Sequence, residues 1–187
     1  MTVTIYVPGT EETDLKKIIM SLQAIGAYLT KGNFAFPATQ NPSTDANTLD
    51  DYEEGTWTPN FTFATPGDLA KTFSLQNAYY TKIGRLVSVS FALVTSAFTH
   101  TTASGNLIIT GLPFTAVNDA GYRSYAPLLF QGITKAGYTQ IMAEMNGNTT
   151  QFMVQACGSG SNVSNVTAAS MPTGGTVILA GLVNYVV

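Results

Sequence analysis

Apolar residues near the start of the chain recur at helical spacing. They predict a helix over residues 11–31, with acidic residues in its first turn and a Lys-Gly pair at its end. The intervals of 3, 4, 3 and 4 positions are those of a heptad seam, made of Leu15, Ile18, Leu22, Ile25 and Leu29. Such a narrow stripe favours packing on copies of the same helix, and a mixed Ile/Leu seam permits a trimer without fixing that number. A lone amphipathic helix lying on the rest of the chain is the alternative.

Further along the chain the period changes from helical to two. In "RLVSVSFALV", Val87, Val89, Phe91 and Leu93 alternate with small residues, so one face is predicted to be core. The other face is predicted to meet water or a small-residue subunit contact. The segments "KTFSLQ" and "NAYYTKI" are expected to be two short strands, and the apolar "VILAGLVNYVV" a strand covered on both faces. Short strands between turn residues predict a β-sandwich or jelly-roll-like domain over residues 55–187.

Residues 33–54 separate these two parts. Proline and turn-forming residues predict an extended linker, and acids dominate its end: Asp50, Asp51, Glu53 and Glu54. Residues 1–54 carry eight acids and three bases, a net of −5, whereas residues 55–187 carry three acids and five bases, a net of +2. We interpret the acidic run as a solvated seam between the N-terminal segment, residues 1–32, and the β domain. A cation site is the alternative, although the run lacks the ligand spacing of a known calcium loop.

The composition excludes several classes of function. Charged residues are only 10% of the chain and form no Lys/Arg cluster, so nucleic-acid binding is not expected. The sequence contains no membrane-spanning apolar run and no recognisable signal peptide. Cys157 and His100 stand alone in their segments, without the partners of a catalytic or metal-binding set. We therefore expect no enzyme activity, no catalytic residue, no cofactor and no bound metal.

Three segments of the chain resemble a domain that recurs in bacteriophage tail fibres and other virion surface proteins. They are "TLDDYEEGTWTP" at residues 48–59, "YTKIGRLV" at residues 80–87 and "GNLIITGLPF" at residues 105–114. The resemblance implies a virion component, often trimeric, whose β domain faces outward on the particle surface. The partners it implies are copies of the same chain and other virion proteins of the capsid, portal or tail.

The resemblance leaves the role on the particle open. The leading hypothesis is a non-enzymatic trimeric fibre or spike, on the tail or the head, that attaches to the host surface. If the ligand is a bacterial glycan, Tyr122, Tyr125 and Tyr138 are the candidate binding residues, because flat rings stack on sugars; ordinary packing is the other interpretation. A capsid decoration or cement protein is a close alternative. A polysaccharide depolymerase is the alternative of another class.

Overall fold

The computed structural model describes residues 28–30 and 33–187 of the chain. The chain divides into two compact units, residues 1–52 and residues 53–187, and each is described by itself. The boundary falls inside the acidic run. Within the described residues, no helix has the length and hydrophobicity needed to cross a membrane.

The first unit contains a short hairpin where the end of a helix was predicted. Strand β1 (Tyr28–Thr30) pairs antiparallel with strand β2 (Asn33–Ala35), and Leu29 is opposite Phe34. The prediction of a helix up to residue 31 is therefore wrong at its end, since Leu29 lies in a strand. The other seam residues, Leu15, Ile18, Leu22 and Ile25, lie outside the described residues.

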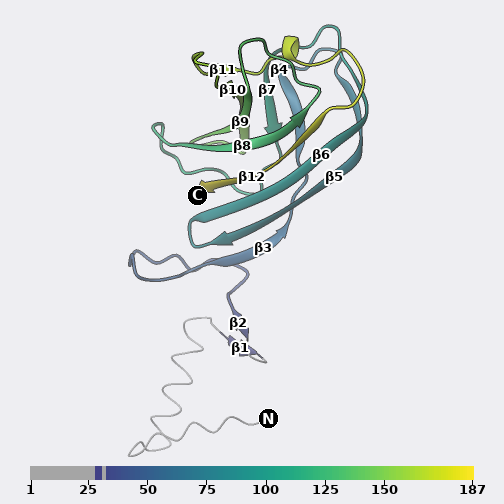
Figure 1. Ribbon diagram of the computed structural model, residues 1–187. Helices are drawn as coiled ribbons and strands as arrows, with labels where there is room; N and C mark the ends of the chain where they lie inside the picture. Colours follow the sequence, from purple (N-terminus) through teal and green to yellow (C-terminus); the bar gives the residue numbers. More distant parts are fainter. Residues whose placement is uncertain (1–27, 31–32) are drawn as a thin grey trace, which may run out of the picture. The chain divides into compact units, whose positions relative to one another are not determined.

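The second unit is built on one ten-stranded sheet that curls on itself (Figure 1). Neighbouring strands follow the order β3-β5-β6-β12-β8-β9-β10-β7-β4, and β11 pairs with β10. Residues 168–170 form a single 3-10 turn, η1. The strands are β3 (Tyr52–Thr56), β4 (Asn60–Thr65), β5 (Ala70–Ile83), β6 (Leu86–Thr99), β7 (Ser104–Thr110), β8 (Arg123–Gln131), β9 (Gln140–Asn146), β10 (Gln151–Cys157), β11 (Ser164–Asn165) and β12 (Ile178–Val186).

Strand β5 corrects another prediction. The segments expected to be two strands form one strand of 14 residues, which pairs with β6 along its whole length. The pairing register shifts near Phe73 and again before Leu75, whereas Gln76 and Asn77, where a break was predicted, pair regularly with Leu93 and Ala92. The β5–β6 hairpin, with 14 residues in each strand, is therefore the longest strand pair of this unit.

The period-two prediction for β6 is confirmed. Val87, Val89, Phe91 and Leu93 are at most 5% exposed, and β12 supplies further buried side chains from the next strand. β12 is a central strand, between β6 and β8. It is not covered on both faces within this chain, however, because Leu182 on its outward side is 56% exposed.

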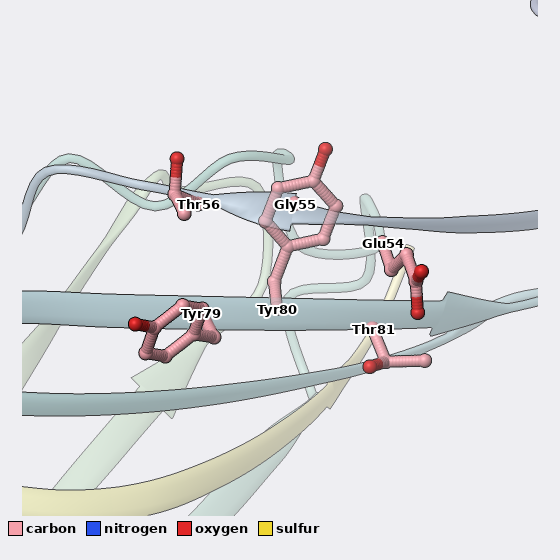
Figure 2. A pocket seen from close by; sticks show the side chains of 6 residues that line it. All are labelled: Glu54, Gly55, Thr56, Tyr79, Tyr80 and Thr81. Atoms are coloured by element: carbon pink, nitrogen blue, oxygen red, sulfur yellow. The ribbon is translucent and has the colours of Figure 1, made fainter.

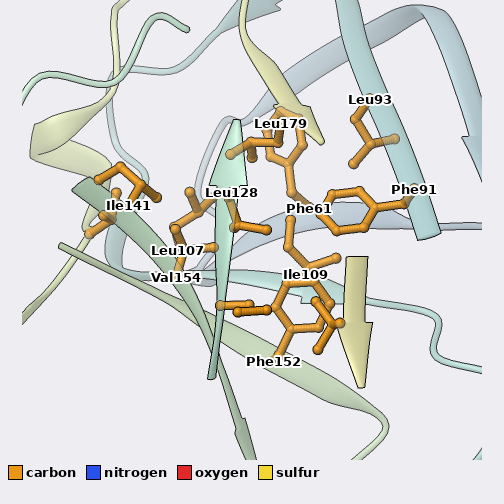
Figure 3. Packing of buried hydrophobic residues seen from close by; sticks show 14 of the residues in the cluster. Phe61, Phe91, Leu93, Leu107, Ile109, Leu128, Ile141, Phe152, Val154 and Leu179 are labelled. Atoms are coloured by element: carbon orange, nitrogen blue, oxygen red, sulfur yellow. The ribbon is translucent and has the colours of Figure 1, made fainter. Parts of the chain in front are cut away.

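The core is closed by packing between opposite parts of the curled sheet. The ring centroid of Phe61 on β4 lies 5.7 Å from that of Phe73 on β5 and 5.8 Å from that of Phe98 on β6. Phe91 on β6 meets Phe152 on β10 at 5.7 Å (Figure 3). The predicted sandwich is thus formed by one continuous sheet whose two halves face each other.

Candidate functional site

The three segments that carry the sequence resemblance meet around the ring of Tyr80. Its hydroxyl donates a hydrogen bond to the carboxylate of Glu53, in the first segment. Its ring packs edge-on against Phe114 of the third segment, with centroids 5.4 Å apart and planes at 84°. These residues are 27 and 34 positions from Tyr80 in the chain, so the fold and not local sequence brings them together.

Gly55 lies directly under this ring. A Cβ atom at position 55 would lie 2.9 Å from Cε1 and from the hydroxyl oxygen of Tyr80, closer than side-chain carbons approach. Figure 2 shows the Tyr80 ring lying across strand β3 at Gly55. The glycine in "YEEGTW" is therefore required by a close approach of an aromatic ring to the backbone.

The hydrogen bond from Tyr80 has an electrostatic consequence. The Glu53 carboxylate, followed by partial burial and the negative charge itself, raises the pKa of the Tyr80 phenol to about 12. The phenol therefore keeps its proton at neutral pH and remains a donor, which rules out its use as a base there.

Trp57 fixes the chain just after this contact. Its indole Nε1 donates to the carbonyl of Ser90 at 3.2 Å, and its ring meets Phe91 at a centroid distance of 6.0 Å. Its backbone amide donates to the carbonyl of Ala78 at 3.4 Å. The tryptophan is only 8% exposed, so it anchors β3 to the β5–β6 hairpin.

A surface pocket of about 360 Å³ opens beside Tyr80. Its lining consists of Glu54, Gly55, Thr56, Tyr79, Tyr80 and Thr81 (Figure 2). It offers threonine hydroxyls, one carboxylate and an exposed tyrosine ring, which suits hydrogen bonding and stacking. The lining contains no histidine, cysteine or serine and no second carboxylate, so it holds no nucleophile–base pair of the usual kind.

The acids of the predicted seam differ in exposure, and the prediction of a solvated run is wrong for Asp51, which is only 6% exposed. Asp50 accepts a hydrogen bond from the backbone amide of Ser43 at 2.8 Å, Glu53 accepts from Tyr80, and Glu54 lines the pocket. Among the described residues, no group of three or more His, Cys, Asp or Glu side chains is arranged to hold a metal ion.

A hydrogen-bonded carboxylate in the β domain, Asp68, was not foreseen from the sequence. Asp68, after β4, accepts hydrogen bonds from the backbone amides of Thr101 and Thr102 at 2.8 Å each and from both threonine hydroxyls. These bonds hold the pKa of the Asp68 carboxyl well below its ordinary value, the Thr101 hydroxyl contributing most. The carboxylate ties two loops together and is occupied by these donors.

His100 and Cys157 are not arranged as a catalytic pair. His100 is 7% exposed and lies between the rings of Phe63 and Phe98, each with its centroid 5.4 Å away. Cys157 is half-buried on β10, and its sulfur is 3.6 Å from the amide oxygen of Gln140. Both side chains serve packing in this arrangement.

The three candidate glycan-binding tyrosines lie in different environments. The Tyr122 hydroxyl accepts a hydrogen bond from the backbone amide of Val186 at 2.9 Å, and the Tyr138 hydroxyl donates to the carbonyl of Asn162 at 2.9 Å. Tyr125, on β8, is 55% exposed. Of the three, Tyr125 thus presents the most open ring.

Polar side chains adjoin Tyr125 on the neighbouring strands. Its cross-strand partner on β9 is Glu144, whose Oε1 lies 3.4 Å from Nε of Arg123. Gln155 on β10 donates to the other Glu144 oxygen and to the side chain of Asn165. This row places an aromatic ring beside charged and amide groups. No pattern in the sequence pointed to it, since its members come from four separate strands.

Comparison with protein-family models and with curated proteins finds no match for the chain. Among solved structures, the crystal structure of the Dettilon tailspike protein (gp208) is similar, with a TM-score of 0.53 and 21% sequence identity. The likeness covers 71% of this chain and 23% of the tailspike chain, so this chain corresponds to less than a quarter of that protein. At this identity the likeness shows a shared fold.

Proposed function

We propose that the chain is a bacteriophage virion surface protein, a homotrimeric fibre or spike that contributes to attachment to the host cell. The observation that supports it most is the likeness of its fold to a tailspike protein over 71% of the chain. The three fibre-like sequence segments support it independently, because they converge on Tyr80 in one structural cluster. In this proposal residues 1–32 attach the trimer to other virion proteins.

A non-enzymatic role is part of the proposal. Asp68 is engaged by two threonines, and Glu144 is engaged by Arg123 and Gln155. Neither carboxylate faces a second one in the described contacts, as glycoside hydrolysis by a carboxylate pair would require. A polysaccharide depolymerase is the competing function.

The row around Tyr125 is the proposed contact for a surface glycan. An exposed ring stacks on the apolar face of a sugar, while guanidinium and amide groups hydrogen-bond its hydroxyls. The ring and these groups lie on adjacent strands β8, β9 and β10, which present them from a rigid support.

The location is tested by antibody labelling of intact particles of the encoding phage, viewed by electron microscopy. We expect label on projections of the tail or head. Particles without label on any outer surface, in a preparation whose denatured protein is recognised by the same antibody, would contradict the proposal. Label spread evenly over the capsid lattice would favour the cement alternative.

Attachment is tested with the purified full chain on host cells and on purified host polysaccharide. Tyr125→Ala is expected to weaken binding by at least about tenfold, the order of a lost stacking contact, whereas Tyr125→Phe keeps the ring and most of the affinity. Equal binding by both variants would exclude this site. Shortening of the polysaccharide during the assay would show a depolymerase instead.

A further inference from the structure

One side of the curled sheet points away from the core along four neighbouring strands. Ala78, Phe91, Gly181 and Leu128 form a row of cross-strand partners on β5, β6, β12 and β8 that faces the core. Positions one residue away on each strand face outward, because successive side chains of a strand alternate. We call the outward side of Leu75–Ile83 on β5, Leu86–Val94 on β6, Ile178–Val186 on β12 and Leu128–Gln131 on β8 the outer face, and Tyr125 lies beyond it on β8.

The outer face is apolar and free of charge. Ten large hydrophobic side chains are exposed in the described part of the chain, and six of them lie here: Leu75, Tyr79, Ile83, Leu86, Leu129 and Leu182. Between them lie alanine, serine, threonine, asparagine and glutamine, and the outward positions of the outer face include no Asp, Glu, Lys or Arg; Arg123 lies beyond the face on β8. Carboxylates occur on the strands that adjoin the four at either edge, Glu54 on β3 and Glu144 on β9.

Contiguous apolar surface of this kind marks a contact with another molecule. A charged partner would bury its charges against a face that offers no counter-charge, which costs free energy. A second copy of the same face brings no charge, and its hydroxyl and amide groups can pair with their equivalents. We propose that the outer face packs on the outer faces of other copies of this chain; this inference rests on the homotrimer proposed above and assigns its interface.

The dimensions of the face fit a three-fold arrangement. Four strands are about 19 Å wide, and nine residues of β5 are about 30 Å long. Three faces of that width around an axis form a triangular prism whose sides lie about 5.5 Å from the axis, close to half of the ~10 Å between packed sheets. Each face covers roughly 570 Å², all of which would be removed from solvent around the axis.

The test uses exposed residues on and off the face. Leu182 and Val163 are 56% and 60% exposed, so lysine at either position is compatible with folding of a single chain. We expect the wild-type chain to show three times the chain mass by light scattering. Leu182→Lys is expected to dissociate it, with association at least about 100-fold weaker, and Val163→Lys to leave it unchanged. Leu129→Lys, on a different strand of the face, is expected to repeat the effect of Leu182→Lys. Circular dichroism of each variant reports folding.

The outcomes separate this inference from the proposed function. A wild-type trimer that keeps its mass in both face variants would overturn the assigned interface and leave the homotrimer standing. A wild-type chain of single-chain mass at high concentration would overturn both. Dissociation by Val163→Lys to the same extent as by Leu182→Lys would also refute the assignment, since the effect would then not belong to this face.

Discussion

Replacement of Gly55 by alanine tests the contact that joins the fibre-like segments. The new methyl group would lie 2.9 Å from two atoms of the Tyr80 side chain, Cε1 and the hydroxyl oxygen. That ring cannot move freely, because Glu53 holds its hydroxyl and Phe114 packs against it. Either β3 separates from β5 locally or the ring rotates and gives up these contacts.

Each of these responses destabilises the fold. Overpacking costs about 1–3 kcal/mol, and a lost hydrogen bond adds about 1 kcal/mol. We expect Gly55→Ala to lower the free energy of unfolding by about 2 kcal/mol, which corresponds to a fall in melting temperature of roughly 6 °C for a domain of this size. Gly174→Ala is the matched control, because the nearest atom to its added Cβ, the carbonyl oxygen of Phe98, is 3.8 Å away. Its expected effect is within about 0.5 kcal/mol.

A double-mutant cycle assigns the cost to the ring. In a Tyr80→Ala background the added methyl group meets no ring, so Gly55→Ala is expected to cost little. Denaturant unfolding of the four proteins at equal concentration should give a coupling energy of at least about 1 kcal/mol. An equal cost of Gly55→Ala in both backgrounds would refute the reasoning, since strand propensity and not Tyr80 would then explain the glycine.

Two pH effects follow from the hydrogen bonds already described. The pKa of the Asp68 carboxyl is lowered from its ordinary value of 3.8, so the carboxylate contributes stability that is lost as the pH falls below 3.8. Asp68→Asn should therefore flatten the acid side of a plot of denaturation midpoint against pH. An unchanged slope would contradict this. Tyr80 and Tyr185 have pKa values raised to about 12, Tyr185 by burial, so the folded protein should lose stability between about pH 10 and pH 12. Phenylalanine at both positions should reduce that loss and remove the latest step of the phenolate absorbance titration.

Local sequence patterns predicted which face of a strand is buried better than they predicted where each element begins and ends. Alternation in β6 identified its core face correctly because packing follows the pleat directly. β5 was divided in error because the polar pair Gln76 and Asn77 resembles a turn, although both residues pair regularly with β6 inside the strand. The end of the expected helix is a hairpin, in which Leu29 finds a partner in Phe34. Helical spacing alone could not reveal that pairing, because the partner strand lies beyond the segment that the spacing describes.

The sites depend on pairings that no spacing rule encodes. Asp68 and the threonines that engage it are 33 and 34 positions apart, and the tyrosine row draws on β8, β9, β10 and β11. The sequence showed that the acidic run is a set of carboxylates, but it could not show which groups they contact. Among them, Glu53 joins two of the resembling segments through its hydrogen bond with Tyr80.

The position of those segments explains why the resemblance transfers a fold more readily than a ligand. Gly55, Trp57 and Tyr80 serve to hold β3 on the β5–β6 hairpin. The exposed Tyr125 lies outside all three segments, on a strand whose outward residues do not stabilise the core. Selection for a different ligand could therefore change the surface near Tyr125 without disturbing the cluster around Tyr80. In the proposed function the glycan contact and the fold depend on different residues, so Tyr125→Ala should alter binding at unchanged stability.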